Sequence, residues 1–110
     1  MDDRQKKYLA DVLQSINNID LHLSGKRDFH LLNDNITILS AIKYEFSVIG
    51  EVINLLLKLD ADIKIDDARK IVGFRNRMVH EYDAIDNTQL WSIIINYLPK
   101  LKIQVEQLLS

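Results

Sequence analysis

Apolar residues recur every three or four positions along nearly the whole chain, and this spacing is the feature that most restricts its fold. A helix turns once in about 3.6 residues, so residues with this spacing share one side of a helix. No segment shows the strict alternation of a half-buried strand. The spacing therefore predicts an all-α protein. The first stripe comprises Tyr8, Leu9, Val12, Leu13, Ile16, Ile19 and Leu23.

Turn and cap residues divide the pattern into segments. Ser24 and Gly25 are expected to end the first helix, since glycine readily adopts the left-handed conformation that closes a helix. A second helix of about thirty residues is expected from near Asp28 to Leu57. Asp66 is predicted to cap a third helix, because a carboxylate accepts hydrogen bonds from free backbone N–H groups.

Two residues inside the predicted helices are unusual. Gly50 costs about 1 kcal/mol relative to alanine in a helix interior, so we expect either a close approach of another helix or a bend there. Pro99 interrupts a last helix that Asp86 or Asn87 caps, and it should kink this helix or divide it. We therefore predict one domain over residues 1–110, an antiparallel up-and-down bundle of four to five helices.

Composition limits what such a bundle can be. With 110 residues, the chain would bury more apolar surface by pairing with a second copy. The formal net charge of −2 means that RNA binding would need a local basic surface. The absence of cysteine excludes disulfides, thiolate metal sites and a cysteine nucleophile. With no apolar leader and no uncharged span of about 20 residues, we expect a cytoplasmic protein without metal or cofactor.

One short stretch after this ordinary pattern concentrates cations, an amide, an imidazole and a phenol, namely Arg75, Asn76, Arg77, His80 and Tyr82. In a helix, Asn76 and His80 share a face and Arg77 lies beside them. Arg75 is separated from His80 by about 140° of rotation and has to reach round. Tyr82 is expected in the turn that leaves the helix.

These groups suit RNA cleavage without a metal ion. A histidine can take the proton of a ribose 2′-hydroxyl or protonate the leaving 5′-oxygen, and an arginine can stabilise the charge that builds on the phosphoryl oxygens. Two chains with facing motifs would supply a second imidazole. A structural interpretation stays open, because the helix dipole also favours cations at a helix C-terminus.

The motif resembles a known signature. Arg75-x4-His80, with Asn76 after the arginine and Tyr82 two residues after the histidine, is similar to that of HEPN domains, and more closely to the HepT-like toxins of type VII toxin–antitoxin pairs. The stretches Val-Ile-Gly-Glu at 48–51 and Ile-Val-Gly-Phe-Arg-Asn at 71–76 resemble this family too.

The resemblance implies a homodimeric HEPN-like bundle that acts as a metal-independent ribonuclease, with tRNA a known kind of target. It implies that Arg75 and His80 are the catalytic pair and that Asn76 orients the histidine or a phosphate, with Arg77 in support. It implies that Tyr82 is modified with AMP by a minimal nucleotidyltransferase antitoxin, which adds bulk and negative charge beside the arginine.

Two further positions follow from the resemblance. Glu51 is expected to support the site, either through a hydrogen bond to the motif helix or as a structural pairing. Where family members often carry an arginine before the Ile-Gly-Glu element, this chain has Lys43, Tyr44 and Glu45, so either Lys43 supplies the charge or this contact is missing. A different class of function also fits the near-neutral charge, namely a non-catalytic helical adaptor that presents a substrate to a nucleotidyltransferase.

Overall fold

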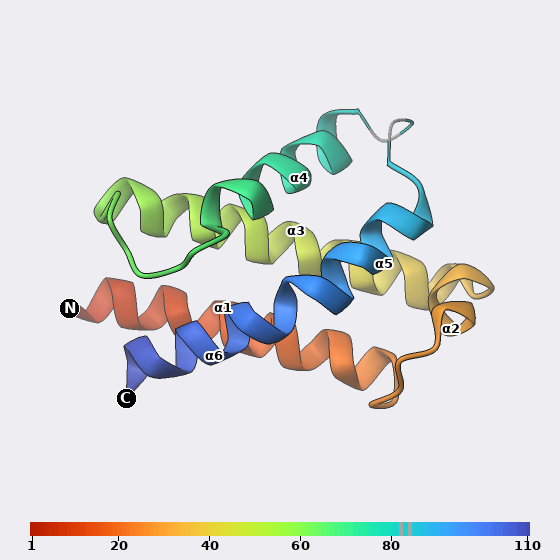
Figure 1. Ribbon diagram of the computed structural model, residues 1–110, viewed down its shortest axis with the longest axis horizontal. Coiled ribbons are helices and arrows are strands. Elements are labelled where there is room, and N and C mark those ends of the chain that lie inside the picture. Colours follow the sequence, from red (N-terminus) through yellow and green to blue (C-terminus); the bar gives the residue numbers. More distant parts are fainter. Residues whose placement is uncertain (82, 84) are drawn as a thin grey trace.

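The chain is helical along nearly its whole length in a computed structural model that describes residues 1–81, 83 and 85–110 (Figure 1). The described helices are α1 (Asp3–His22), α2 (Phe29–Asn33), α3 (Ile36–Leu59), α4 (Ala68–His80), α5 (Asn87–Asn96) and α6 (Leu98–Leu109). No strand occurs in these residues, so the all-α prediction is confirmed. None of the described helices is both long and apolar enough to cross a lipid bilayer.

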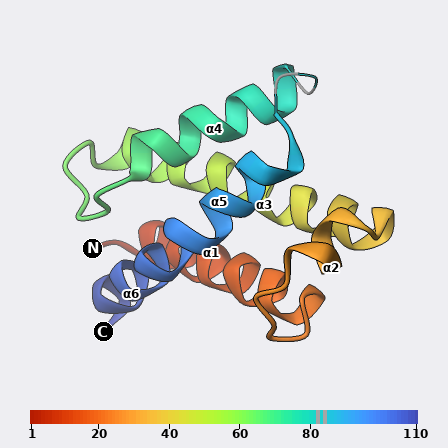
Figure 2. The same ribbon diagram turned by 45° about the vertical axis from the view of Figure 1, so that its right-hand side comes forward.

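Helices α1 and α3 run antiparallel and form the centre of the bundle (Figures 1 and 2). Helix α6 packs on α1, α4 packs on α3, and α5 contacts α6 and the short α2. The predicted antiparallel bundle is thus confirmed. The largest side chains that are fully buried come from helices α1 to α5 and the α1–α2 connection, and they are Phe46, Leu9, Ile19, Leu23, Leu32, Ile42, Ile49, Ile53, Leu56, Ile71, Leu90 and Ile94.

The predicted second helix is wrong in its length, because the structure divides it into α2 and α3. Asp28 caps α2 by accepting from the His30 N–H at 3.0 Å, so the predicted start is correct. Asn35 then accepts from the N–H groups of Thr37 and Ile38 at 3.0 and 3.1 Å and starts a new helix. Asparagine competes in this way with helix continuation. The apolar spacing hid the break because both helices face the same core.

Other predicted helix ends are confirmed. Ser24 and Gly25 both have positive φ, at 55° and 72°, where α1 ends. Asp86 caps α5 by accepting from the Gln89 N–H at 2.8 Å, while the Gln89 side chain accepts from the Asp86 N–H at 2.9 Å. Pro99 lies in the first turn of α6 and separates it from α5, since proline lacks the N–H that a continuous helix would need.

The predicted cap of α4 is wrong. Helix α4 begins at Ala68, and Asp66 lies outside it. The Asp66 carboxylate lies 3.2 Å from Lys100 Nζ, and the Asp66 N–H donates to Gln104 Oε1 at 3.1 Å. Lys100 Nζ also lies 3.6 Å from the Asp67 carboxylate. The side chain of Asp66 therefore binds a cation on α6 instead of backbone N–H groups, and these contacts join the start of α4 to α6.

Candidate functional site

Helix α4 crosses α3 at Gly50 so closely that Arg75 fills the space above the glycine. A Cβ atom added to Gly50 would overlap Cβ and Cγ of Arg75 and would lie 3.2 Å from its Cδ. No side chain fits there without a shift of one helix. The close approach considered for Gly50 is therefore confirmed. It fixes the first part of the Arg75 side chain against α3.

The Arg75 guanidinium lies at the boundary between α3 and α4. Its Nη1 donates to Asn76 Oδ1 at 3.2 Å, and its Nη2 lies 3.9 Å from Glu51 Oε2. The Arg75 side chain is 20% exposed, and its Nε is buried without a hydrogen-bond partner among the described residues. A long ion pair and one hydrogen bond leave most of its five donors uncommitted. The group therefore keeps capacity for an anion at the surface.

His80 is the last residue of α4 and is exposed. The helix closes there, as the Glu81 N–H donates to the Arg77 carbonyl at 2.8 Å. Within the described part of the chain, no hydrogen bond or ion pair engages the His80 imidazole. The exposed imidazole is therefore open to the approach of a substrate.

Asn76 occupies the angular position between Arg75 and His80 on the surface of α4. The predicted role for Asn76 was to orient the histidine or a phosphate, and the hydrogen bond in the structure goes to the arginine. Because its Oδ1 accepts from Arg75, the amide N–H groups of Asn76 remain as donors toward solvent. Arg77 is exposed next to this group, and no carboxylate of the described residues lies within ion-pair distance of it.

Glu51 lies next to Arg75 of the motif helix, but it is a surface residue. Its side chain is 66% exposed, so it supports Arg75 from the surface and not from a buried position. Lys43 is half-buried, and no hydrogen bond or ion pair of the described residues joins it to the motif. Glu45 is buried, with its Oε2 lacking a partner among the described residues. Tyr82, the expected modification site, lies outside the described residues.

Two exposed apolar side chains beside the motif were not predicted. Tyr44 is 67% exposed and Val79 is 43% exposed. Tyr44 lies two helical turns from Glu51 on the same side of α3, and Val79 lies one turn from Arg75 on α4. The sequence signal that could have identified these two residues is their helical spacing from Glu51 and from Arg75. Each therefore lies on the side of its helix that carries one member of the Glu51–Arg75 ion pair.

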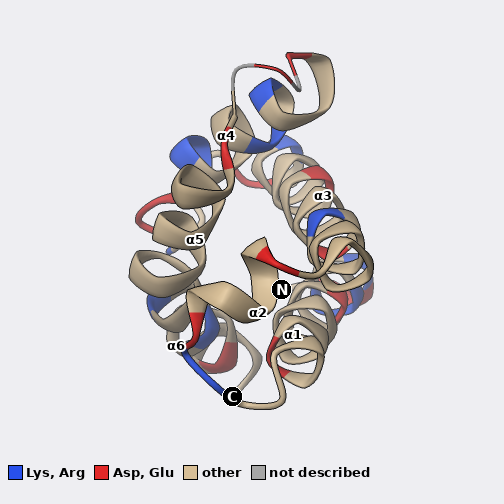
Figure 3. Cartoon of the chain, turned by 90° about the vertical axis from the view of Figure 1, so that its right-hand side faces the viewer, with Lys and Arg blue, Asp and Glu red and all other residues tan. Residues whose placement is uncertain are grey.

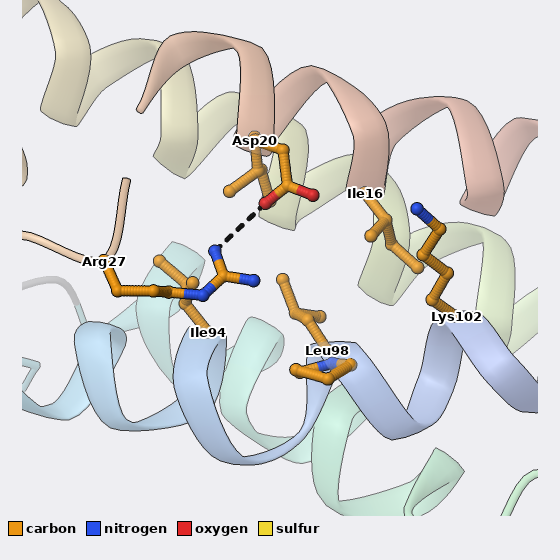
Figure 4. A pocket seen from close by; sticks show the side chains of 8 residues that line it. Ile16, Asp20, Arg27, Ile94, Leu98 and Lys102 are labelled. Carbon is orange, nitrogen blue, oxygen red and sulfur yellow. Dashed lines mark hydrogen bonds and ion pairs between the residues drawn. The ribbon is translucent and has the colours of Figure 1, made fainter. Parts of the chain in front are cut away.

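A cavity lies elsewhere, between α1 and the junction of α5 and α6 (Figure 4). Apolar side chains form most of it, and the Asp20–Arg27 ion pair of 3.1 Å lies at its margin. None of the motif residues contributes to its wall; the lining residues are Ile16, Ile19, Asp20, Arg27, Ile94, Leu98, Pro99 and Lys102. Because groups suited to proton transfer or phosphate binding gather at the motif, we place the candidate active site there and not in the cavity.

The motif supplies two complementary chemical elements. The Arg75 guanidinium has a fixed position and a permanent charge, which suits stabilisation of negative phosphoryl oxygens. The exposed His80 imidazole is a group of the kind that serves as a general acid or base. No group of three or more His, Cys, Asp or Glu side chains in the described ranges is arranged as metal ligands would be.

Comparisons with known proteins agree with this chemistry. The sequence model of the family described as "Ribonuclease HepT-like" matches residues 12–108. A Methanocaldococcus jannaschii protein named as a candidate RNase is 30% identical, and the alignment covers 92% of this chain and 93% of that protein. A second candidate RNase from the same organism is 23% identical, with 96% and 90% covered. No solved structure gives a significant match.

Proposed function

The chain belongs to the HepT-like ribonuclease family, and from this premise we propose that it cleaves RNA internally without a metal ion, with Arg75 and His80 as the catalytic pair. In the reaction, the ribose 2′-oxygen attacks the adjacent phosphorus and the bond to the 5′-oxygen breaks. The 2′-hydroxyl loses its proton, and the leaving oxygen gains one. His80 performs one of these transfers, and Arg75 stabilises the phosphoryl oxygens.

One observation carries this proposal, namely the way in which the structure holds Arg75. The missing side chain of Gly50 leaves room for the first carbon atoms of the Arg75 side chain. Asn76 Oδ1 accepts a hydrogen bond from Arg75 Nη1, and Glu51 Oε2 lies 3.9 Å from Arg75 Nη2. A guanidinium held in this way needs little rearrangement when charge develops on a substrate, which is the condition for effective electrostatic stabilisation. An arginine used only for surface solubility would not need a helix crossing at glycine.

The direct test is RNA cleavage by His80→Ala, with His22→Ala as the matched control. His22 is also exposed and ends a helix, but it lies on α1. We expect His80→Ala to reduce the cleavage rate by roughly 10²- to 10⁴-fold and His22→Ala to leave it unchanged. A substrate with a 2′-deoxyribose at the cleavage position should resist cleavage, and EDTA should have no effect. Equal cleavage by His80→Ala and wild type would refute the proposal.

A second copy of the chain would complete the site. Each chain has one motif histidine for two proton transfers, and the exposed Tyr44 and Val79 beside the motif offer apolar surface for a second copy. We expect Tyr44→Glu with Val79→Glu to lower the mass in solution from dimer to monomer and to remove cleavage. Mixing inactive Arg75→Ala and His80→Ala proteins should restore part of the activity if each site takes residues from both chains. No recovery after subunit exchange would contradict a composite site.

The toxin–antitoxin role rests on the sequence position of Tyr82, two residues after His80. In this proposal a nucleotidyltransferase antitoxin transfers AMP to the tyrosine oxygen in the cytoplasm, releases pyrophosphate from ATP, and places a negative phosphate near Arg75. Coexpression with such an enzyme should increase the intact mass by one or more AMP units and suppress cleavage. Tyr82→Phe should show neither effect. An unchanged mass of the wild-type protein would exclude this form of control.

The alternative is a non-catalytic adaptor for a nucleotidyltransferase, and the net charge of −2 favours it because the chain as a whole does not attract RNA. The adaptor hypothesis predicts a stable complex with the transferase and no RNA cleavage by the free protein. Cleavage that depends on His80 would exclude it.

A further inference from the structure

The charges of α4 are segregated from those of the rest of the chain. This helix, residues 68–80, contains the cations Arg69, Lys70, Arg75 and Arg77 and no Asp or Glu. The whole chain has 14 Lys and Arg against 16 Asp and Glu. This helix is therefore a local concentration of positive charge in a chain whose net charge is slightly negative, and Figure 3 marks the Lys and Arg positions along the chain in blue. Such a surface concentrates polyanions near it.

Most of these cations lie on the outer side of α4. Arg69, Gly73, Arg77 and His80 recur at spacings of four, four and three residues, so they form one line along the helix, and all four are exposed. Lys70 is exposed at the edge of this line. Among the described helices, α4 packs against α3 alone, and Figures 1 and 3 show it at the periphery of the bundle. We call the line of Arg69, Gly73 and Arg77 the outer ridge.

The acidic residues closest in sequence to the start of the ridge are engaged elsewhere. Lys100 Nζ lies 3.2 Å from the Asp66 carboxylate and 3.6 Å from the Asp67 carboxylate. Within the described ranges, no carboxylate lies within 4.0 Å of the cationic groups of Arg69, Lys70 or Arg77. Lys100 of α6 thus pairs with the two carboxylates, and the ridge cations form no ion pair with the described residues.

Gly73 leaves a gap in the middle of the ridge. A Cβ atom added there would meet no atom of the described residues within 4 Å, apart from its own helix backbone and chain neighbours. Glycine in a helix interior costs about 1 kcal/mol relative to alanine, and at Gly73 no close neighbour in the described part of the chain requires it. The gap instead lets a ligand approach the helix backbone between Arg69 and Arg77.

From these observations we infer that the outer ridge is a binding track for the RNA backbone, which extends the active site from His80 toward Arg69. This inference rests on the proposed ribonuclease function. The track from Arg69 to His80 spans about 16 Å at 1.5 Å per residue, enough for a few nucleotides of a single strand. Arg77 holds the phosphate next to the cleaved one, Arg69 and Lys70 hold phosphates further along, and the strand passes over Gly73. The contacts go to the backbone and are therefore independent of sequence.

Binding and cleavage should be measured separately to test the track. The binding probe is a single-stranded oligonucleotide with 2′-O-methyl groups, which cannot be cleaved, followed by fluorescence anisotropy at several salt concentrations. The ridge variant combines Arg69→Gln with Lys70→Gln. The control combines Lys6→Gln with Lys26→Gln, which removes the same charge from exposed positions away from α4. Circular dichroism of each protein verifies that the variants are folded.

We expect the ridge variant to bind roughly tenfold more weakly than the control at 0.15 M salt, with a salt slope reduced by about 0.7 per lost phosphate contact. Its KM for RNA cleavage should rise more than its kcat falls. Gly73→Glu should weaken binding more than Gly73→Gln, because the two side chains have the same size and differ in charge.

Equal binding by the ridge and control variants would overturn the track while leaving the ribonuclease function intact. Wild-type binding that depends on the ridge, without any cleavage, would support the track and overturn the ribonuclease function. If the ridge variant instead loses association with a coexpressed nucleotidyltransferase and keeps its RNA binding, the ridge is a protein-docking surface and the track is wrong.

Discussion

The inner and outer sides of α4 carry the same types of residue and use them in opposite ways. On the inner side, Gly50 of α3 and Arg75 are so close that neither position has free space. On the outer side, Gly73 stands beside Arg69 and Arg77 with no neighbour around its missing Cβ. Helix packing therefore fixes the inner arginine, while the outer arginines are placed for a ligand to reach.

The difference shows that a glycine can occupy a helix interior for more than one physical reason. Gly50 is a requirement of the fold, because its absent side chain makes room for a catalytic group of the proposed mechanism. Gly73 is not required by packing, so its cost in helix stability has to be explained by function or by chance. Substitutions at the two positions should accordingly have opposite signs.

The largest change in stability is expected for Gly50→Ala. The added methyl group would overlap Cβ and Cγ of Arg75, and the Cβ atom is fixed by the backbone, so a change of side-chain rotamer cannot relieve the overlap. Overpacking of this kind costs about 1 to 3 kcal/mol. Urea unfolding should show the loss as a lower midpoint, and RNA cleavage should fall as Arg75 is displaced. Wild-type stability of Gly50→Ala would show that α4 does not rest on α3 in this way.

Arg75→Ala should come next, because it removes a packed stem together with a charge. The side chain is 20% exposed, and a long cationic side chain can stabilise through its methylene groups. We expect a loss of about 1 to 2 kcal/mol from Arg75→Ala and a smaller loss from Arg75→Lys, with cleavage impaired in both, since lysine cannot form the planar fork.

The free energy of unfolding of His80→Ala gives the corresponding measurement for the outer side of α4. Truncation of an exposed side chain should change the free energy of unfolding by less than about 0.5 kcal/mol. If His80→Ala instead costs several kcal/mol, the motif is structural on both sides of α4 and the comparison fails.

Gly73→Ala is expected to stabilise the protein. The new methyl group meets no atom within 4 Å, and alanine is favoured over glycine in a helix by about 0.5 to 1 kcal/mol. The midpoint of urea unfolding should rise, in contrast to the fall for Gly50→Ala. Destabilisation would mean that another chain covers the outer ridge in solution.

The smallest change in stability is expected from loss of the ion pair between Asp66 and Lys100, which joins the start of α4 to α6. The hydrogen bond from Lys100 is the main cause that lowers the pKa of Asp66 below its ordinary 3.8, and the hydrogen bond to Asp66 raises the pKa of Lys100 above 10.5. The contribution of ionised Asp66 to the stability of the fold is present above pH 3.8 and disappears as the pH falls through the lowered pKa. The contribution of protonated Lys100 to the stability of the fold is present below pH 10.5 and disappears as the pH rises through the raised pKa.

Melting temperatures of wild type and Lys100→Gln should therefore differ by a small and constant amount between about pH 5 and 9. The difference should shrink toward the acid and alkaline ends. Lys102→Gln removes a cation from the same helix that forms no ion pair with the described residues, and it should show no such profile. A difference that grows as the pH falls below 4 would contradict the assigned sign.

The apolar spacing was sufficient to predict the helical class and the antiparallel bundle, because core residues such as Ile49 and Ile53 follow the helical period. It could not predict the break at Asn35, since the buried stripe continues across it. The capping error at Asp66 has a similar origin: the sequence shows a carboxylate near a helix start, but not the Lys100 ammonium from α6 that competes for it.

For the candidate site, the sequence was sufficient to place Asn76 and His80 on one side of a helix and Arg75 on another. It could not show that Asn76 binds Arg75, because the direction in which a long side chain turns depends on the neighbouring helix. Nor could it distinguish the crowded Gly50 from the open Gly73, since that distinction depends on which helix covers each position.

The crossing of α3 and α4 also bears on when the protein becomes active during its synthesis. The chain emerges from the ribosome with α3 first, and Arg75 has no fixed position until α4 has folded back onto Gly50. In the proposed mechanism, a nascent or truncated chain that lacks this crossing would carry the arginine and the histidine without their catalytic arrangement. Cleavage by that mechanism therefore cannot begin until the ribosome has made α4 and the helix has folded back onto α3.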